Sequence, residues 1–231
     1  MDIGYLTTDA ARYSSKNWKK VLTLGILFVM GFLIIPAFLF MGYVFRVLKW
    51  SIKDVNDLPD YDNWGEMLID GFKVFLVQLI YFIIPFIIIF GGMWASVGSL
   101  IVLQDAGATA YPTTALSFMG GTFILGLVVT FIFGVFFTIG LANMAYNEGE
   151  LKAAFQFREI MDMISKIGWV DFIVWYVVMI IVGSVMGFVA SILILIPVLG
   201  WALIMLILFP YLYLLFARAL GLLFISGFKK P

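Results

Sequence analysis

The sequence contains no cysteine and no histidine among its 231 residues. Their absence excludes disulfides, thiolate nucleophiles, the usual zinc ligands and the side chain whose unperturbed pKa lies nearest neutrality. The chain also lacks a P-loop, a dinucleotide-binding fingerprint, a G-x-S-x-G motif and an HExxH motif. We expect no catalytic residues, no metal site and no cofactor, and the balance leans away from an enzyme without excluding one.

Charge is also scarce, since 12% of the residues are charged and 64% are hydrophobic. A soluble domain carries about 25% charged and about 45–50% apolar residues. A soluble fold of this size cannot hide such an excess, so lipid must face much of it. The 14 basic residues equal the 14 acidic ones. This balance gives no reason to expect a nucleic-acid partner.

The hydrophobic residues fall into five long segments, at about residues 21–47, 68–90, 117–146, 169–196 and 201–228. At about 1.5 Å per helical residue, each is long enough for the roughly 30 Å hydrocarbon core of a bilayer. We therefore predict an all-α integral membrane helical bundle, a single multi-pass domain over residues 1–231 in the cell membrane, with the lipid bilayer as its partner.

The first segment, residues 21–47, has Pro36 near its middle, and proline favours a kink because it removes a backbone hydrogen bond. A kinked span is the default prediction. A re-entrant wedge is the alternative, because both flanks are basic, with Lys16, Lys19 and Lys20 before the segment and Arg46, Lys49 and Lys53 after it. The choice decides on which side of the membrane the N-terminus lies.

Two polar segments are predicted to lie in the membrane interface. Residues 1–20 form an arm with basic residues near its end, read as a surface helix or as a frayed arm with basic anchors. Residues 148–166 are amphipathic. Their predicted apolar face consists of Ala153, Ala154, Phe157, Ile160, Met161 and Ile164.

A polar linker, residues 48–67, separates the first two segments, and we call residues 54–73 the polar belt. The belt holds six of the 14 acidic residues. Their spacing matches no ordered calcium-loop pattern, so a solvated acidic linker is a better interpretation than a cation site. Asn63 followed by Glu66 fits a capping box, which predicts a helix start at this point.

The belt also carries a family resemblance. The residues Leu58-Pro59-Asp60-Tyr61-Asp62-Asn63-Trp64-Gly65-Glu66, followed by Asp70, resemble the opening signature of an uncharacterised domain-of-unknown-function family of multi-pass membrane proteins, mostly archaeal with some bacterial members. Residues 81–85, 151–157 and the IPVLGW hairpin at 196–201 are similar in order and character. The resemblance implies a multi-pass membrane protein with no established activity.

Two stripes of small residues are candidate helix-packing seams, because small side chains let helix backbones approach closely in lipid. The first stripe recurs every four residues and consists of Thr122, Gly126, Thr130, Gly134, Thr138 and Ala142. The second consists of Gly183, Gly187 and Ser191. Packing within one subunit is the first interpretation, and a homo-oligomer seam or a pore wall is the alternative.

Three polar side chains fall within the hydrophobic segments, namely Gln78, Asn143 and Arg218. Polar groups at membrane depth are expected to be functional or to be paired. Arg218 lies about 15 Å from the end of the last segment by helical rise. It either extends toward the headgroups or makes a buried contact to Asn143 or a neighbouring carbonyl.

The distribution of basic residues predicts the orientation, because lysine and arginine near span ends favour the cytoplasm. Residues 104–116 and 197–200 contain neither, so both are expected outside. The polar linker and the C-terminus are then expected in the cytoplasm.

Two functions follow as hypotheses. The first is a non-enzymatic membrane-organising or complex-assembly component, with a homo-oligomer or a membrane-complex partner. The alternative is a small oligomeric permease or channel, with the Thr/Gly stripe along its path. A lipid-modifying enzyme that uses Asp62, Glu66 or Asp70 at headgroup level is the weakest hypothesis.

Overall fold

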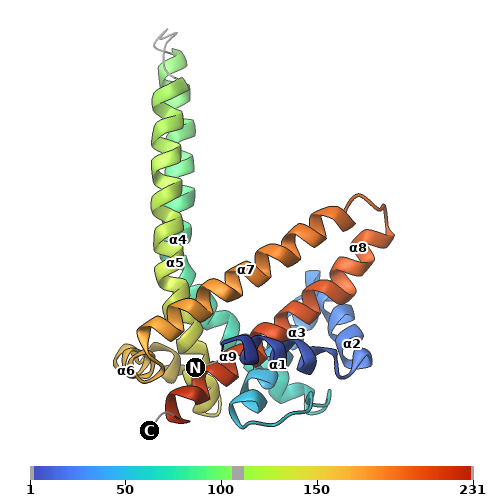
Figure 1. Ribbon diagram of the computed structural model, residues 1–231. Coiled ribbons are helices and arrows are strands. Elements are labelled where there is room, and N and C mark those ends of the chain that lie inside the picture. Colours follow the sequence, from blue (N-terminus) through green and yellow to red (C-terminus); the bar gives the residue numbers. More distant parts are fainter. Residues whose placement is uncertain (1–2, 106–111, 230–231) are drawn as a thin grey trace. The chain divides into compact units, whose positions relative to one another are not determined.

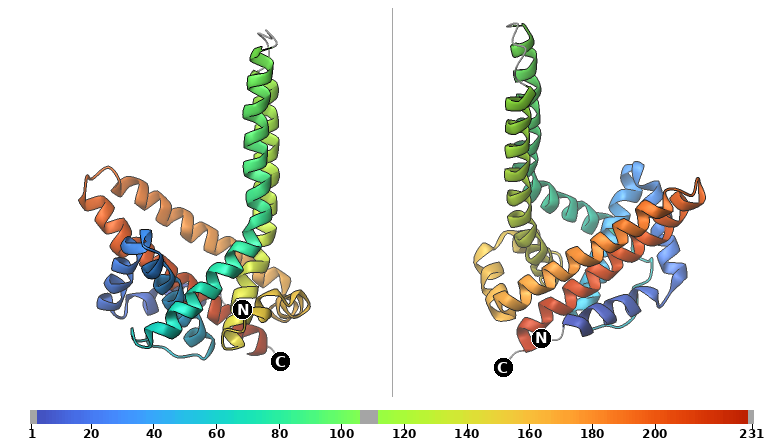
Figure 2. Two further views of the ribbon diagram at one scale, coloured as in Figure 1. Left: turned by 180° about the vertical axis from the view of Figure 1, so that it is seen from behind. Right: turned by 45° about the horizontal axis from the view of Figure 1, so that its top comes forward.

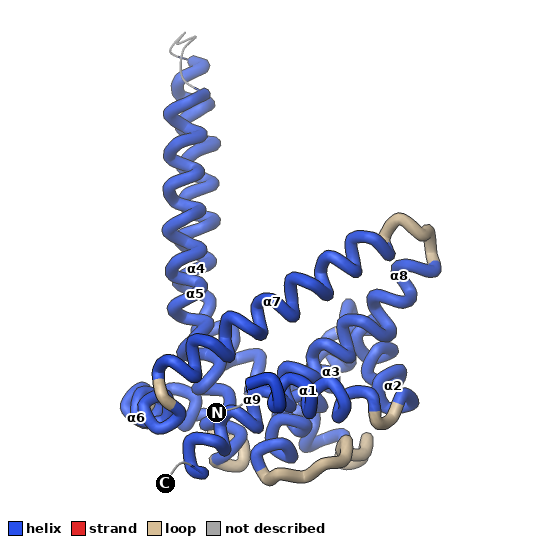
Figure 3. Tube along the Cα trace, viewed as in Figure 1, coloured by secondary structure: helices blue, strands red, loops and turns tan. Residues whose placement is uncertain are grey.

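The regular structure is entirely helical in the part of the chain that the computed structural model describes, residues 3–105 and 112–229 (Figure 3). The elements are α1 (Ile3–Ser15), α2 (Trp18–Val29), η1 (Met30–Phe32), α3 (Ile34–Ile52), α4 (Trp64–Asp105), α5 (Pro112–Tyr146), η2 (Leu151–Phe155), α6 (Phe157–Ile167), α7 (Trp169–Leu193), α8 (Leu199–Leu203), η3 (Ile204–Leu208) and α9 (Phe209–Lys229). The elements η1 and η2 are 3-10 helices, and η3 is a π-helix. The all-α prediction is confirmed.

Five helical stretches of the described chain are long and apolar enough to cross a membrane, judged by length and composition. They are Ile34–Ile52, Trp64–Gly98, Gly120–Tyr146, Trp169–Leu193 and Leu199–Phe228. These helices are compatible with a multi-pass membrane protein. Residues 106–111, which belong to the predicted outer loop, lie outside the described residues.

The chain forms two compact units. Unit 1 consists of Met1–Phe75 and Ile139–Pro231, and unit 2 consists of Leu76–Thr138. Unit 2 is a helical hairpin made from the parts of α4 and α5 that fall within it (Figure 1). Helix α4 continues without interruption past Gly91 and Gly92, so residues 93–103 are a helical continuation of the second segment.

Helix α9 is the centre of unit 1 and packs against α1, α3 and α6 (Figure 1). Small residues permit two of these contacts. A Cβ on Gly221 would overlap Ser51 of α3, and a Cβ on Gly227 would lie 3.0 Å from Ile167 and from Met163 of α6. The close packing of α9 therefore depends on the absence of side chains at these glycines.

Helices α3 and α4 cross through a reciprocal pair of glycines. A Cβ on Gly42 of α3 would overlap the carbonyl oxygen of Met67, and a Cβ on Gly71 of α4 would overlap that of Phe38. Backbone therefore packs directly on backbone, which is how small residues bring membrane helices together.

The first hydrophobic segment is two helices rather than one kinked span. Helix α2 ends at η1, Leu33 is extended with φ −89° and ψ 137°, and α3 begins at Ile34. Pro36 lies in the first turn of α3, where its missing N–H costs nothing because the first N–H groups of a helix have no partner within that helix. The helices fold back on each other, with the rings of Phe28 and Phe40 5.1 Å apart. We call this pair the α2–α3 hairpin.

The amphipathic segment has a different apolar face from the predicted one. The chain leaves helical geometry at Gln156, with ψ 72°, before α6 begins. This interruption changes the helical phase. Phe157 and Met161 are exposed, whereas Met163 and Ile167 are buried with Ile160 and Ile164. The apolar face of α6 packs on α9.

Candidate functional site: the belt loop and its donors

Residues 54–63, which we call the belt loop, join α3 to α4 without forming a helix. A non-helical segment must find partners for its backbone carbonyls. Side-chain donors supply them, and the carbonyls that accept are those of Val55, Asn56, Asp57, Leu58, Pro59, Asp60, Asp62 and Asn63. The donors are Tyr13, Lys16, Lys20, Tyr43, Arg46 and Arg218.

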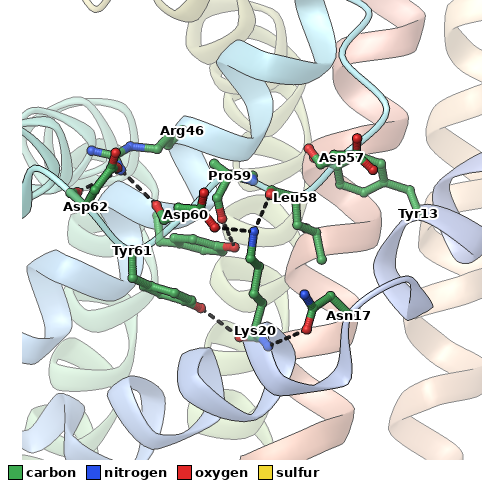
Figure 4. Close-up of polar contacts among 11 residues, drawn as sticks. Tyr13, Asn17, Lys20, Arg46, Asp57, Leu58, Pro59, Asp60, Tyr61 and Asp62 are labelled. Atoms are coloured by element: carbon green, nitrogen blue, oxygen red, sulfur yellow. Dashed lines mark hydrogen bonds and ion pairs between the residues drawn. The ribbon is translucent and has the colours of Figure 1, made fainter.

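Two cations from the α2–α3 hairpin hold the middle of the belt loop (Figure 4). Lys20 Nζ donates to the carbonyl of Leu58 at 2.7 Å and lies 2.7 Å from Asp60 Oδ1. Arg46 Nη1 donates to the carbonyl of Asp60 at 3.0 Å and to Asp62 Oδ1 at 2.7 Å. Hydrogen bonds that involve a charged group contribute about 1.5–3 kcal/mol each. The acid side chains face solvent, as expected for an acidic linker, but the loop backbone is tightly bound.

Tyrosine hydroxyls add further contacts. Tyr13 donates to the carbonyl of Asp57 at 3.0 Å, and Tyr43 donates to that of Pro59 at 2.9 Å. Tyr61 points the other way and donates to the carbonyl of Lys20 at 2.7 Å, while its ring stacks on Tyr43 at 4.1 Å. Burial raises the pKa of the Tyr13 and Tyr61 hydroxyls above its ordinary value. Both therefore remain protonated donors at neutral pH.

The belt loop thus fixes both arms of the α2–α3 hairpin at one place. Lys20 lies at the start of α2 and Arg46 in α3, and both bind Asp60. About 20 Å of helix separates Lys20 from the hairpin tip at 1.5 Å per residue. The tip is apolar and exposed, and Phe32 is 82% exposed there. In both views of Figure 2 the tip and the α7–α8 turn lie at the same end of unit 1.

Arg218 of α9 connects the belt loop to α1. Its side chain is 1% exposed. Nε donates to Asp9 Oδ1 at 2.9 Å, Nη1 donates to the carbonyl of Val55 at 3.0 Å, and Nη2 donates to Asn56 Oδ1 at 2.5 Å. The guanidinium also lies over the ring of Tyr13, 4.7 Å from its centroid. Arg218 is therefore buried against a carbonyl, as one alternative anticipated, and its side-chain partners are Asp9 and Asn56.

Lysines also hold the turn that follows α5. Lys49 Nζ lies 2.7 Å from Asp70 Oδ2, and both side chains are about nine-tenths buried, at 10% and 7% exposed. Lys73 donates to the carbonyl of Gly149 at 2.9 Å, and Lys53 lies 2.8 Å from Glu148. The Lys53 hydrogen bond lowers the pKa of the Glu148 carboxyl. These contacts join α3, α4 and the turn into one polar cluster.

The structure places the motif residues of the belt as follows. Pro59 is buried, and Asn63 has φ +47°, a left-handed conformation that asparagine tolerates. Helix α4 begins at Trp64, directly after Asn63, as the capping pattern predicts. Gly65 and Glu66 are exposed on the first turn, and Asp70 is buried beside Lys49.

The Thr/Gly stripe lies on the packed side of α5. Its members are buried or half-buried, whereas neighbouring residues such as Phe123 and Leu127 are exposed. A Cβ on Gly92 of α4 would overlap Thr122, and a Cβ on Gly126 would overlap Ile89. Within unit 2 the stripe is therefore a close contact between α4 and α5. The hydroxyls of Thr130 and Thr138 donate to the carbonyls four residues earlier, each at 2.7 Å.

The second stripe is differently placed. A Cβ on Gly183 would lie 3.5 Å from Phe216, but a Cβ on Gly187 would meet open space, and Ser191 is exposed.

Of the remaining polar candidates, Gln78 is exposed. Asn143 is buried and donates to the carbonyl of Ala153 at 2.9 Å, which ties the end of α5 to η2.

In the described part of the chain, no three Asp or Glu side chains come together as a group that could hold a metal ion. Sequence reasoning missed two donors that bind the belt loop, Tyr13 and Tyr43, and it missed Asp9, which binds Arg218. The sequence does show the cations Lys16, Lys20 and Arg46, but it predicts headgroup anchors for the two lysines and a basic flank of the first segment for Arg46. An excess of acids in one loop and cations in the helices around it is the signal that could have paired them.

Comparison with known proteins identifies the family. Residues 29–195 match the model described as "Protein of unknown function (DUF4013)". The uncharacterized protein MJ1189 of Methanocaldococcus jannaschii is 29% identical over 177 residues, which cover 74% of this chain and 56% of the relative. The uncharacterized protein MJ0233 of the same organism is 24% identical over 177 residues, which cover 75% of this chain and 55% of the relative.

The chain therefore spans about half the length of these two relatives. No solved structure matches it. The prediction of an uncharacterised domain-of-unknown-function family is confirmed, because the family model covers well over half of the chain and the matched relatives are archaeal. The chain belongs to the DUF4013 family of proteins of unknown function.

Proposed function

We propose that this protein is a non-enzymatic integral membrane protein that organises the membrane, and that its α2–α3 hairpin enters the bilayer and returns to the same side. One observation carries the proposal: Lys20 of α2 and Arg46 of α3 both bind Asp60 of the belt loop. A hairpin held by both arms at one polar loop cannot place its ends on opposite sides of a membrane. The parts of the arms between these two cations and the tip are about 20 Å long, which is also shorter than the roughly 30 Å hydrocarbon core.

The polar groups of the belt support a structural role. Its donors bind backbone carbonyls, and each of Asp57, Asp60, Asp62 and Asp70 lies beside a lysine or arginine. A permease would need a polar path through the bilayer. The Thr/Gly stripe offers little support for one, because it packs against α4 and two of its hydroxyls bond to their own helix. A bulky Gly134→Leu change tests this point: a packing seam should lose assembly, whereas a transporter should lose flux while still assembling.

We further propose that the belt, α6 and the C-terminus face the cytoplasm. Basic residues near span ends favour that side. The belt loop, α6 and α9 are joined within unit 1, through Arg218 on one side and Gly227 on the other. A returning hairpin would put α1 on that side too. A crossing first segment would instead leave the basic residues Arg12, Lys16, Lys19 and Lys20 outside, against this rule.

Labelling of single cysteines tests the proposal, since the chain has none of its own. Thr8→Cys, Glu66→Cys and Ser165→Cys would each introduce a thiol at an exposed position of unit 1. On intact cells an impermeant thiol reagent should leave all three unlabelled until the membrane is permeabilised, while Thr109→Cys in the predicted outer loop should label at once. Labelling of Thr8→Cys from outside, with Glu66→Cys protected, would show that the first segment crosses and would overturn the proposal.

A further inference from the structure

We infer that unit 1 occupies more area in the belt-side leaflet than in the opposite one, so that the protein favours membranes that are convex toward the belt side. This inference rests on the proposed function, because it requires the α2–α3 hairpin to return to the side from which it entered. The partner is therefore a leaflet under curvature stress, recognised through its loosened packing rather than through a headgroup.

The hairpin has the polarity of an inserted wedge. One end is the belt loop, with the pairs Lys20–Asp60 and Arg46–Asp62. The other end, residues 29–35, has no charged or hydrogen-bonding side chain. Phe32, Ile34 and Ile35 are 82%, 73% and 62% exposed there. An apolar end of this kind is solvated by lipid tails, and a charged end by headgroups and water.

The hairpin is held firmly enough to act on the bilayer. A Cβ on Gly25 of α2 would overlap the backbone of Leu206 in η3, so α2 packs directly on the last hydrophobic segment. On the other arm, Gly42 and Gly71 bring α3 and α4 into backbone contact. The hairpin therefore cannot be displaced without separating helices of unit 1.

Two more elements add area at the belt side. Helix α1 is fixed there by Tyr13, which binds the belt loop, and by Asp9, which binds Arg218. Helix α6 has its buried face on α9 near Gly227, and Asn143 reaches from α5 to Glu159 of α6 at 3.3 Å. In the described residues, the opposite end of unit 1 has only the hairpin tip and the α7–α8 turn (Figure 2). Amphipathic helices at one interface make binding sensitive to curvature.

Sorting between vesicles of different size tests the inference. The full chain carrying Ser165→Cys would be labelled with a dye and reconstituted into uncharged phosphatidylcholine vesicles of mixed diameter. An impermeant quencher then separates molecules whose belt faces outward from those whose belt faces inward. The belt-outward molecules should be enriched about twofold on vesicles of about 50 nm over those of about 400 nm, and the belt-inward molecules should be depleted.

A matched pair of variants assigns the effect to the hairpin. Replacing Ile34 and Ile35 by asparagine should reduce the enrichment toward one, whereas replacing both by leucine keeps the tip apolar and should preserve it. Equal sorting of belt-outward and belt-inward molecules would overturn the inference. Where Thr8→Cys and Glu66→Cys label from the same side of the membrane, equal sorting would remove only the curvature preference and leave the proposed function intact. Labelling from opposite sides would instead remove the proposed function and the inference with it.

Discussion

Replacement of Arg218 by leucine should destabilise the folded protein strongly. The change leaves Asp9, three-quarters buried, without its cation, and it leaves the carbonyl of Val55 and the side chain of Asn56 without a donor. Removal of one partner from a buried ion pair costs about 3–5 kcal/mol. At 2–4 °C per kcal/mol for a chain of this size, the melting temperature in detergent should fall by about 10 °C.

Two further variants separate the ion pair from other effects of the mutation. Arg158→Leu removes an exposed arginine from α6 and should leave the melting temperature within about 2 °C of the parent. Asp9→Asn combined with Arg218→Leu should recover about 1–3 kcal/mol of the loss, because no unpaired carboxylate then remains. The reasoning is refuted if Arg218→Leu melts with the parent, or if Asp9→Asn brings no recovery.

Three other predictions follow from the belt and the helix crossing. Lys49→Met alone should cost about 3–5 kcal/mol of unfolding free energy. Addition of Asp70→Leu should restore most of this loss, because an apolar pair can replace a buried ion pair. If the losses of the two single mutants simply add in the double mutant, the two side chains do not form a direct pair. Gly71→Ala should cost about 1–3 kcal/mol of unfolding free energy, because the added Cβ overlaps the backbone of Phe38. In Gly65→Ala the added Cβ meets open space, so this change should be neutral or stabilising by up to about 1 kcal/mol. Equal melting temperatures for the two variants would disprove the close crossing of α3 and α4. The raised pKa of the Tyr61 hydroxyl means that the unfolded chain loses this proton first, so above about pH 10 this one group should lower stability by about 1.4 kcal/mol per pH unit. Tyr61→Phe should reduce the slope of stability against pH by that amount in urea titrations, and an unchanged slope would count against a buried hydroxyl.

The hydrophobic segments were predictable because each obeys a rule that operates within a single helix. Long apolar runs and helix-start signals are local, so α4 begins directly after Asn63, and both α7 and the continuous helical stretch Leu199–Phe228 fall close to their expected ranges. The break in the first segment was only partly predictable. Pro36 marks its neighbourhood, but a kink and a full reversal look alike in sequence, and the reversal depends on contacts such as Phe28 with Phe40.

The belt loop shows why the candidate site was less predictable. Its acids are visible in the sequence, and their exposure could be expected. Its backbone partners come from positions as distant as Tyr13 and Arg218, and no local pattern connects these to the carbonyls of Val55 or Asp57. Arg218 could be selected by its depth alone, but the identity of its partners depends on how α1 and the loop fold against α9.

The most direct test of the returning hairpin is the depth of its tip. Ile34→Cys would carry an environment-sensitive fluorophore in protein reconstituted with lipids that bear quenchers at defined depths along their acyl chains. The account predicts the strongest quenching from groups within the hydrocarbon, and no reaction of the thiol with impermeant reagents from either side. Strongest quenching at the headgroups of the leaflet opposite Glu66, or labelling of Ile34→Cys from that side, would mean that the first segment crosses the bilayer and would contradict the account.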